Sequence, residues 1–105
     1  MDVIADRRLK LRTDKGSIDV TVKIGRPQPG PSAEDWICPY EIWVGDERRS
    51  MEMHGIDSIQ ALQLTIATLD VELRHSARKY AGTLFHYDEP FTSILEGSGL
   101  DVRRS

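Results

Sequence analysis

Hydrophobic and polar residues alternate strictly in two neighbouring segments near the start of the chain. Leu9 and Leu11 alternate with charged residues, and the same period of two continues from Ile18 to Ile24. This alternation is typical of a β-strand with one face in the core and the other in water. Residues 13–16, Thr-Asp-Lys-Gly, separate the segments and suit a tight turn. The pattern therefore predicts a β-hairpin.

A second hairpin is expected in the middle of the chain. Its first strand has an inward series that comprises Cys38, Tyr40, Ile42 and Val44. Trp43 belongs to the outward series of the same strand, and residues 45–47 supply the turn. Residues 50–54 alternate again and complete the hairpin. Two successive hairpins predict a four-stranded antiparallel meander.

The two hairpins are joined by a segment rich in proline. It contains Pro27, Pro29 and Pro31. Because proline lacks the amide donor of a strand ladder, we expect residues 25–35 to form a mobile surface loop that does not extend the sheet.

A long amphipathic helix is predicted after the second hairpin. Asp57 and Gln60 fit a capping box, in which Asp57 accepts a hydrogen bond from the amide of Gln60. A helix of about 23 residues is roughly 35 Å long and exceeds a seven-residue strand, so it should lie diagonally on the sheet or project beyond it. The predicted core stripe consists of Ile59, Leu62, Ile66, Leu69, Leu73 and Tyr80.

The segment after the helix is predicted to add a short strand and a partly ordered tail. Residues 83–87 are aromatic and strand-like, and the tail from residue 88 carries the apolar cluster Phe91, Ile94 and Leu95. Residues 1–105 are therefore expected to form one α+β domain. Its architecture is an antiparallel four- to five-stranded meander with one long helix packed on one face, in the order ββββαβ.

Two short motifs carry a resemblance to a known family. The first is the W-x-C-P-Y sequence at residues 36–40, and the second is the G-x-D-S-x-Q-A-L-Q-L sequence at residues 55–64. Together they resemble a family of small bacterial proteins classified only as a domain of unknown function. The resemblance covers roughly residues 3–90. It implies a bacterial origin and the meander-plus-helix fold, but no activity.

Composition narrows the classes of function. The net charge of −3 is mildly acidic, and the arginine pairs at 7–8, 48–49 and 103–104 are dispersed along the chain. Both features argue against nucleic-acid binding, unless the first two arginine pairs come together on the sheet as one basic patch. No signal peptide or long apolar run is present, so we expect no membrane span. Cys38 is the lone cysteine, which fits a reducing, cytoplasmic compartment.

No catalytic, metal or cofactor signature stands out. His54, His75 and His86 show no metal-ligand spacing, and the inward position of Cys38 indicates a core thiol rather than a nucleophile. We therefore assign no catalytic residue, metal or cofactor, and we favour a binding protein over an enzyme.

Four residues form the candidate interaction surface. Trp36 and Trp43 could anchor a partner at the sheet, and Leu64 and Val71 lie opposite the predicted core stripe of the helix. The leading hypothesis is a non-catalytic domain that binds another protein or itself, as a homodimer or as an immunity or antitoxin-like protein.

The alternative is a small-molecule-binding protein or enzyme. Its pocket would lie between the loop at 27–31, the helix start at Asp57, and the aromatic residues Phe85 and Tyr87.

Overall fold

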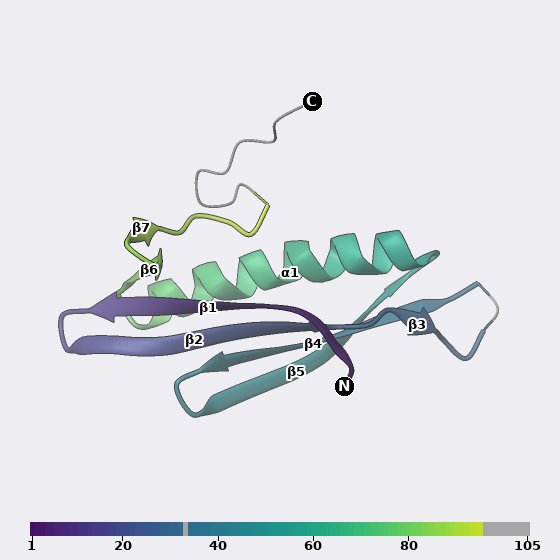
Figure 1. Ribbon diagram of the computed structural model, residues 1–105, viewed down its shortest axis with the longest axis horizontal. Helices are drawn as coiled ribbons and strands as arrows, with labels where there is room; N and C mark the ends of the chain where they lie inside the picture. The colour runs from purple at the N-terminus through teal and green to yellow at the C-terminus, as the bar shows by residue number, and fades with distance from the viewer. Residues whose placement is uncertain (33, 96–105) are drawn as a thin grey trace.

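The structure is a computed structural model that describes residues 1–32 and 34–95. Its elements are β1 (Val3–Thr13), β2 (Gly16–Gly25), β3 (Gln28–Pro29), β4 (Trp36–Val44), β5 (Glu47–Gly55), α1 (Ser58–Lys79), β6 (Thr83–His86) and β7 (Glu89–Pro90). They form one antiparallel sheet with one long helix on it (Figure 1). The predicted α+β class is confirmed.

The strands lie in the order β5-β4-β2-β1-β6-β7. Both predicted hairpins are present, with β1 paired to β2 from Thr13↔Gly16 onward and β4 paired to β5 along its whole length. Because β2 also pairs with β4, the four long strands form the predicted meander. The strand expected after the helix is β6, which pairs with β1 at residues 10–12.

The prediction that the proline-rich segment adds nothing to the sheet is wrong at one point. Gln28 and Pro29 form β3, which pairs with Ile37 and Trp36 of β4. A two-residue strand tolerates proline because only one amide donor is lost, and the residue lies at the end of the ladder. Whether the rest of residues 25–35 is mobile stays a prediction.

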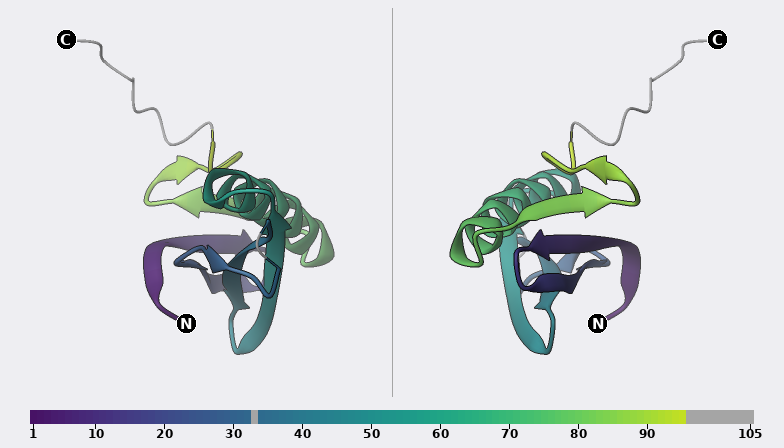
Figure 2. Two further views of the ribbon diagram at one scale, coloured as in Figure 1. Left: turned by 90° about the vertical axis from the view of Figure 1, so that its right-hand side faces the viewer. Right: turned by 90° about the vertical axis from the view of Figure 1, so that its left-hand side faces the viewer.

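The helix begins as the capping residues predict. The Asp57 carboxylate accepts a hydrogen bond from the Gln60 amide at 2.7 Å, and Gln60 Oε1 accepts one from the Ile56 amide at 2.8 Å. The helix lies on one face of the sheet and runs obliquely to β4 and β5 (Figures 1 and 2). It does not project, because β1 and β2 have 11 and 10 residues rather than the seven assumed.

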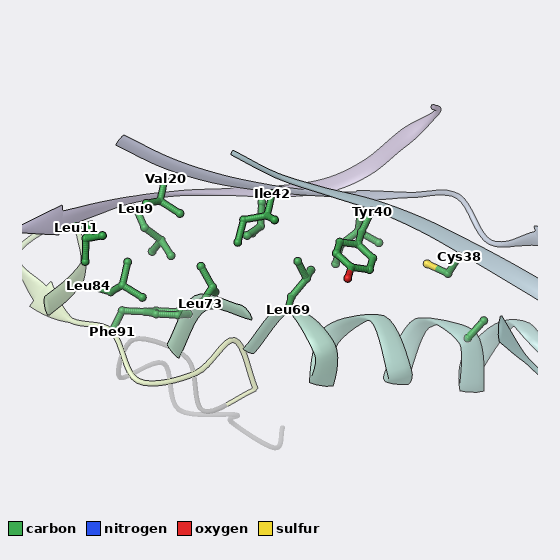
Figure 3. Close-up of a cluster of buried hydrophobic side chains, with 13 residues drawn as sticks. Leu9, Leu11, Val20, Cys38, Tyr40, Ile42, Leu69, Leu73, Leu84 and Phe91 are labelled. Atoms are coloured by element: carbon green, nitrogen blue, oxygen red, sulfur yellow. The ribbon is translucent and has the colours of Figure 1, made fainter. Parts of the chain in front are cut away.

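The core lies between the sheet and the helix (Figure 3). Leu11, Val20 and Tyr40 of the sheet are fully buried against Leu69 and other helix residues. Only part of the predicted helix stripe is in this core. The residues that are buried on the helix are Ala61, Thr65, Leu69, Asp70 and Leu73.

One residue of the predicted stripe lies outside the core. Ile59 is 67% exposed, because the helix is rotated so that the small side chains of Ala61 and Thr65 face β4 and β5. The hydroxyl of Thr65 is satisfied by donating a hydrogen bond to the Ala61 carbonyl at 2.9 Å. Small buried residues let the helix approach the sheet closely, and hydrophobic periodicity does not reveal them.

The described part of the tail docks on the helix. Phe91 is buried, and Ile94 packs against the core, whereas Leu95 is exposed. The segment is held by the buried Asp70, whose Oδ1 accepts a hydrogen bond from the Ile94 amide at 2.7 Å. Two members of the predicted apolar cluster are thus in contact with the core, and residues 96–105 lie outside the described residues.

Asp70→Ala should destabilise the domain by about 1–3 kcal/mol, because the Ile94 amide loses its partner in a half-buried setting. Faster hydrogen exchange of the Ile94 amide should accompany the loss. Asp70→Asn is the matched control, since its side-chain oxygen still accepts this hydrogen bond. Equal stability of Asp70→Ala and the wild type in urea unfolding would contradict this account of the tail.

Candidate functional site

The sheet has one face that the helix does not cover. The helix lies on the opposite side of β1, β2 and β4, and β6 and β7 continue the sheet beyond β1 (Figure 2). We call the helix-free side the outer face. The outward side chains of the long strands form it: Asp6, Arg8 and Lys10 of β1, Asp19, Thr21 and Lys23 of β2, Glu41 and Trp43 of β4, and Arg48, Ser50 and Glu52 of β5.

Trp43 lies in the middle of the outer face. The strand register places it in one row with Arg8, Thr21 and Arg48. The Arg48 guanidinium lies over its ring at 5.8 Å from the centroid. The indole Nε1 is shielded from solvent and has no hydrogen-bond partner among the described residues, whereas part of the ring is exposed.

Trp43 also helps to line a shallow hollow on the outer face. The residues around this hollow are Asp6, Arg8, Thr21, Lys23, Trp43 and Gly45. A second hollow, toward β6, begins at Arg8 and Thr21 and extends to Phe85 and Tyr87. The outer face therefore combines an aromatic centre with polar surroundings, which is the composition of many protein-binding surfaces.

Charges of opposite sign alternate on this face. Lys10 is ion-paired with Asp19, and Arg48 lies 3.9 Å from Glu41. Arg8 and Arg48 are in one row, but Arg7 and Arg49 point to the helix side, where Arg49 lies 3.4 Å from Glu72. The first two arginine pairs therefore do not form one basic patch. The third pair, Arg103 and Arg104, lies outside the described residues.

The four candidate residues do not form one surface. Trp36 is half-buried and packs against the core on the helix side of β4, so it does not share the outer face with Trp43. Leu64 is 39% exposed and Val71 55% exposed, both on the helix side turned away from the sheet. The structure thus separates a sheet surface around Trp43 from a helix surface around Leu64 and Val71.

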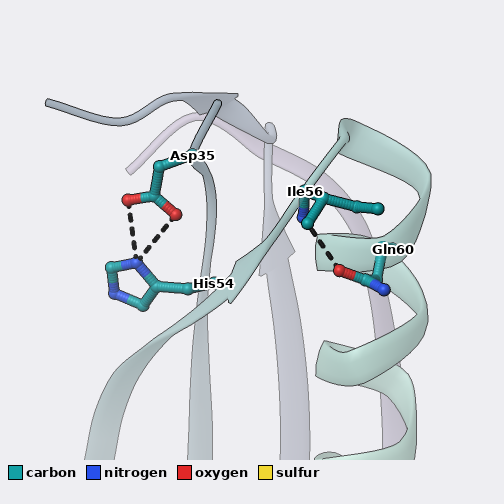
Figure 4. Close-up of polar contacts among 4 residues, drawn as sticks. All are labelled: Asp35, His54, Ile56 and Gln60. Atoms are coloured by element: carbon teal, nitrogen blue, oxygen red, sulfur yellow. Dashed lines mark hydrogen bonds and ion pairs between the residues drawn. The ribbon is translucent and has the colours of Figure 1, made fainter. Parts of the chain in front are cut away.

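The three histidines lie on different elements and have different neighbours. His54 is exposed at the end of β5, and its Nδ1 lies 3.2 Å from the Asp35 carboxylate (Figure 4). His75 is exposed on the helix. His86 packs against Tyr87, and burial lowers its pKa, with a smaller contribution from the positive charge of Arg7.

The buried polar groups of the core belong to the fold. The Cys38 thiol is fully buried and donates to the Gly25 carbonyl at 3.6 Å, which fits a core thiol. Burial raises the pKa of Tyr40 to about 12, and the neighbouring Glu72 carboxylate adds to the shift. The Tyr40 hydroxyl and Glu72 Oε2 are both buried, and neither has a hydrogen-bond partner within the described residues.

The pocket of the alternative hypothesis is not formed. Asp57 and the proline-rich segment lie at one end of the molecule, whereas Phe85 and Tyr87 belong to the β6–β7 end (Figure 1). In residues 1–32 and 34–95, no group of three or more histidine, cysteine or acidic side chains could hold a metal ion. Within the same described residues, α1 is too polar to cross a membrane.

The sheet order, the single helix and the outer face define a small α+β domain. Over residues 5–94 the chain matches a family described as a domain of unknown function (DUF6968), and it belongs to this family. The resemblance noted from the two motifs is thereby confirmed at the level of an uncharacterised family. No curated protein and no solved structure matched the chain.

Proposed function

We propose that this domain is a non-catalytic protein-interaction domain that binds its partner through the outer face, with Trp43 as the anchor. The observation that carries the proposal is a partly exposed tryptophan ring at the centre of a sheet face that no described element covers. Tryptophans in such positions are over-represented among the residues that dominate binding free energy.

The alternating charges support a protein partner rather than a nucleic acid. Lys23 lies between Asp6 and Glu41 in the strand register, and Lys10 and Arg48 each have a carboxylate beside them. A polyanion would be repelled by these carboxylates, whereas a protein surface can carry a complementary pattern. An immunity or antitoxin-like role and self-association are two forms of this proposal, and the identity of the partner decides between them.

The proposal predicts that Trp43→Ala weakens partner binding by about 30-fold or more, the loss typical of a central aromatic anchor. The measurement is affinity capture from cells that carry the gene, followed by titration of the purified partner against each variant. Thr21→Arg is the second test, because it puts a bulky charge beside the Trp43 ring.

Val71→Glu is the matched control, since Val71 is exposed on the helix surface and far from the outer face. It should bind as the wild type does. Binding that survives both Trp43→Ala and Thr21→Arg, or that fails only in Val71→Glu, would refute the proposed surface. Circular dichroism of each variant shows whether the fold is retained.

A further inference from the structure

One edge of the sheet is only partly paired. β1 pairs with β2 along its length, but β6 pairs with β1 only from Lys10 to Arg12. In the part of the chain that the structure describes, no strand lies beside residues 5–9 on that side. We call residues 5–9 the free edge. An unpaired strand edge is a template for another strand.

The direction of the backbone groups on the free edge follows from neighbouring hydrogen bonds. The Phe91 amide donates to the Leu84 carbonyl at 2.8 Å, so the backbone of Leu84 points toward β7 and that of Phe85 toward β1. Since Phe85 is paired with Lys10, Lys10 points its own amide and carbonyl toward β6. Alternation along β1 then directs the amides and carbonyls of Arg8 and Asp6 out of the free edge.

The same two residues carry charges that form no ion pair with another described residue. Neither the Asp6 carboxylate nor the Arg8 guanidinium has an ion-pair partner in residues 1–32 and 34–95, although the next residue on that face, Lys10, is paired with Asp19. Asp6 and Arg8 are both exposed and both belong to the outer face. They present one negative and one positive charge, two residues apart, beside the free backbone groups.

We infer that the free edge pairs with the free edge of a second copy of this chain. In an antiparallel pair centred on Arg7, Asp6 of each copy lies opposite Arg8 of the other, so two ion pairs accompany four backbone hydrogen bonds. A shift of the register by two residues would place Asp6 opposite Asp6 or Arg8 opposite Arg8. The first shift brings only like charges together, and the second would need the edge at Lys10, which β6 already occupies, so one register remains.

The limits of the free edge fit this register. A bulge between Val3 and Ala5 ends regular pairing on one side, and β6 takes over the edge at Lys10 on the other. The five residues between these limits are symmetric about Arg7. This register also places the two Arg7 side chains opposite each other, a like-charge pair that opposes the two attractive pairs, and each guanidinium lies 5.8 Å from the centroid of its own Phe91 ring.

The edge of β7 is less suited to self-pairing, because β7 has two residues and one of them is Pro90, which cannot donate a hydrogen bond. A dimer paired through the free edge leaves the outer face of each copy uncovered. The outer faces of the two copies would then form one larger surface.

The test is sedimentation equilibrium of the purified chain alone, from low micromolar to near millimolar concentration. The wild type should dimerise, and Asp6→Arg or Arg8→Asp should each weaken the dimer roughly tenfold, because two attractive pairs become repulsive. The double variant Asp6→Arg/Arg8→Asp should restore it. Lys15→Asp, the same kind of charge change in the exposed turn between β1 and β2, should leave dimerisation unchanged.

A wild type that stays monomeric over this range would overturn the inference. So would a dimer that ignores both single reversals, or one that the double variant does not rescue. Because no other protein is present, this result is independent of whether Trp43 anchors a different partner.

Discussion

Gly55→Ala is expected to destabilise the domain by about 3 kcal/mol, because an added methyl group would overlap the first turn of the helix. A Cβ atom at Gly55 would lie 2.5 Å from the Ala61 amide nitrogen and 2.9 Å from its Cα. These are backbone atoms, and the Ala61 amide is fixed by its hydrogen bond to the Asp57 carbonyl at 3.1 Å. The end of β5 and the helix would have to separate.

Gly45→Ala is the control for this prediction. A Cβ atom there meets only Ile18 Cγ2, at 3.5 Å, so its cost comes from the φ of +60° and should be about 1–2 kcal/mol. Urea unfolding of both variants gives the comparison. If Gly55→Ala were as stable as the wild type, the close approach of β5 to the helix would not exist in solution.

Leu69→Ala should have the second large effect, a loss of about 2–5 kcal/mol. Leu69 is fully buried between the helix and the sheet, so its truncation removes apolar contacts and leaves a cavity (Figure 3). Unfolding in urea measures the loss.

Leu64→Ala makes the same chemical change on the other side of the same helix. Leu64 is 39% exposed, so we expect a loss below about 1 kcal/mol. Equal losses for the two variants would show that the helix rests on the sheet in a different rotation from the one described.

The long strands and the helix start were predictable because their signals are local. Alternation over Ile18–Ile24 depends only on which face a side chain takes, and the structure buries Val20, Val22 and Ile24 and partly buries Ile18. The capping interactions of Asp57 and Gln60 lie within one turn of the chain. Local patterns of this kind do not depend on contacts with residues far away in the sequence.

The rotation of the helix could not be predicted in the same way. Its apolar residues are spread over a wide arc, and the choice of buried side depends on the curved sheet and on the tail that covers Asp70. Ile59 was expected in the core and is exposed, while Asp70, which is not part of the predicted stripe, is buried. Each outcome depends on contacts between residues far apart in sequence.

The candidate surface was predicted in part. Alternation along β4 placed Trp43 on the outer face, as the structure has it. The same alternation puts Trp36 on the inward side with Cys38, so its choice as a surface anchor went against the pattern, and the structure has it against the core. The charged residues of the free edge, Asp6 and Arg8, gave no signal. They lie on an unpaired strand edge because β6 pairs with β1 only from Lys10 to Arg12. Hydrophobic periodicity does not show which strands pair, so this edge could not be predicted.

Site-specific photo-crosslinking tests the proposed binding surface most directly. A photoreactive amino acid replaces Thr21, beside Trp43 on the outer face, or Ala67, on the exposed helix side, and each protein is irradiated in cells that carry the gene. We expect a covalent adduct with one defined protein from position 21 and none from position 67. An adduct from position 67 alone, or none from position 21, would contradict the assignment of the outer face as the binding surface.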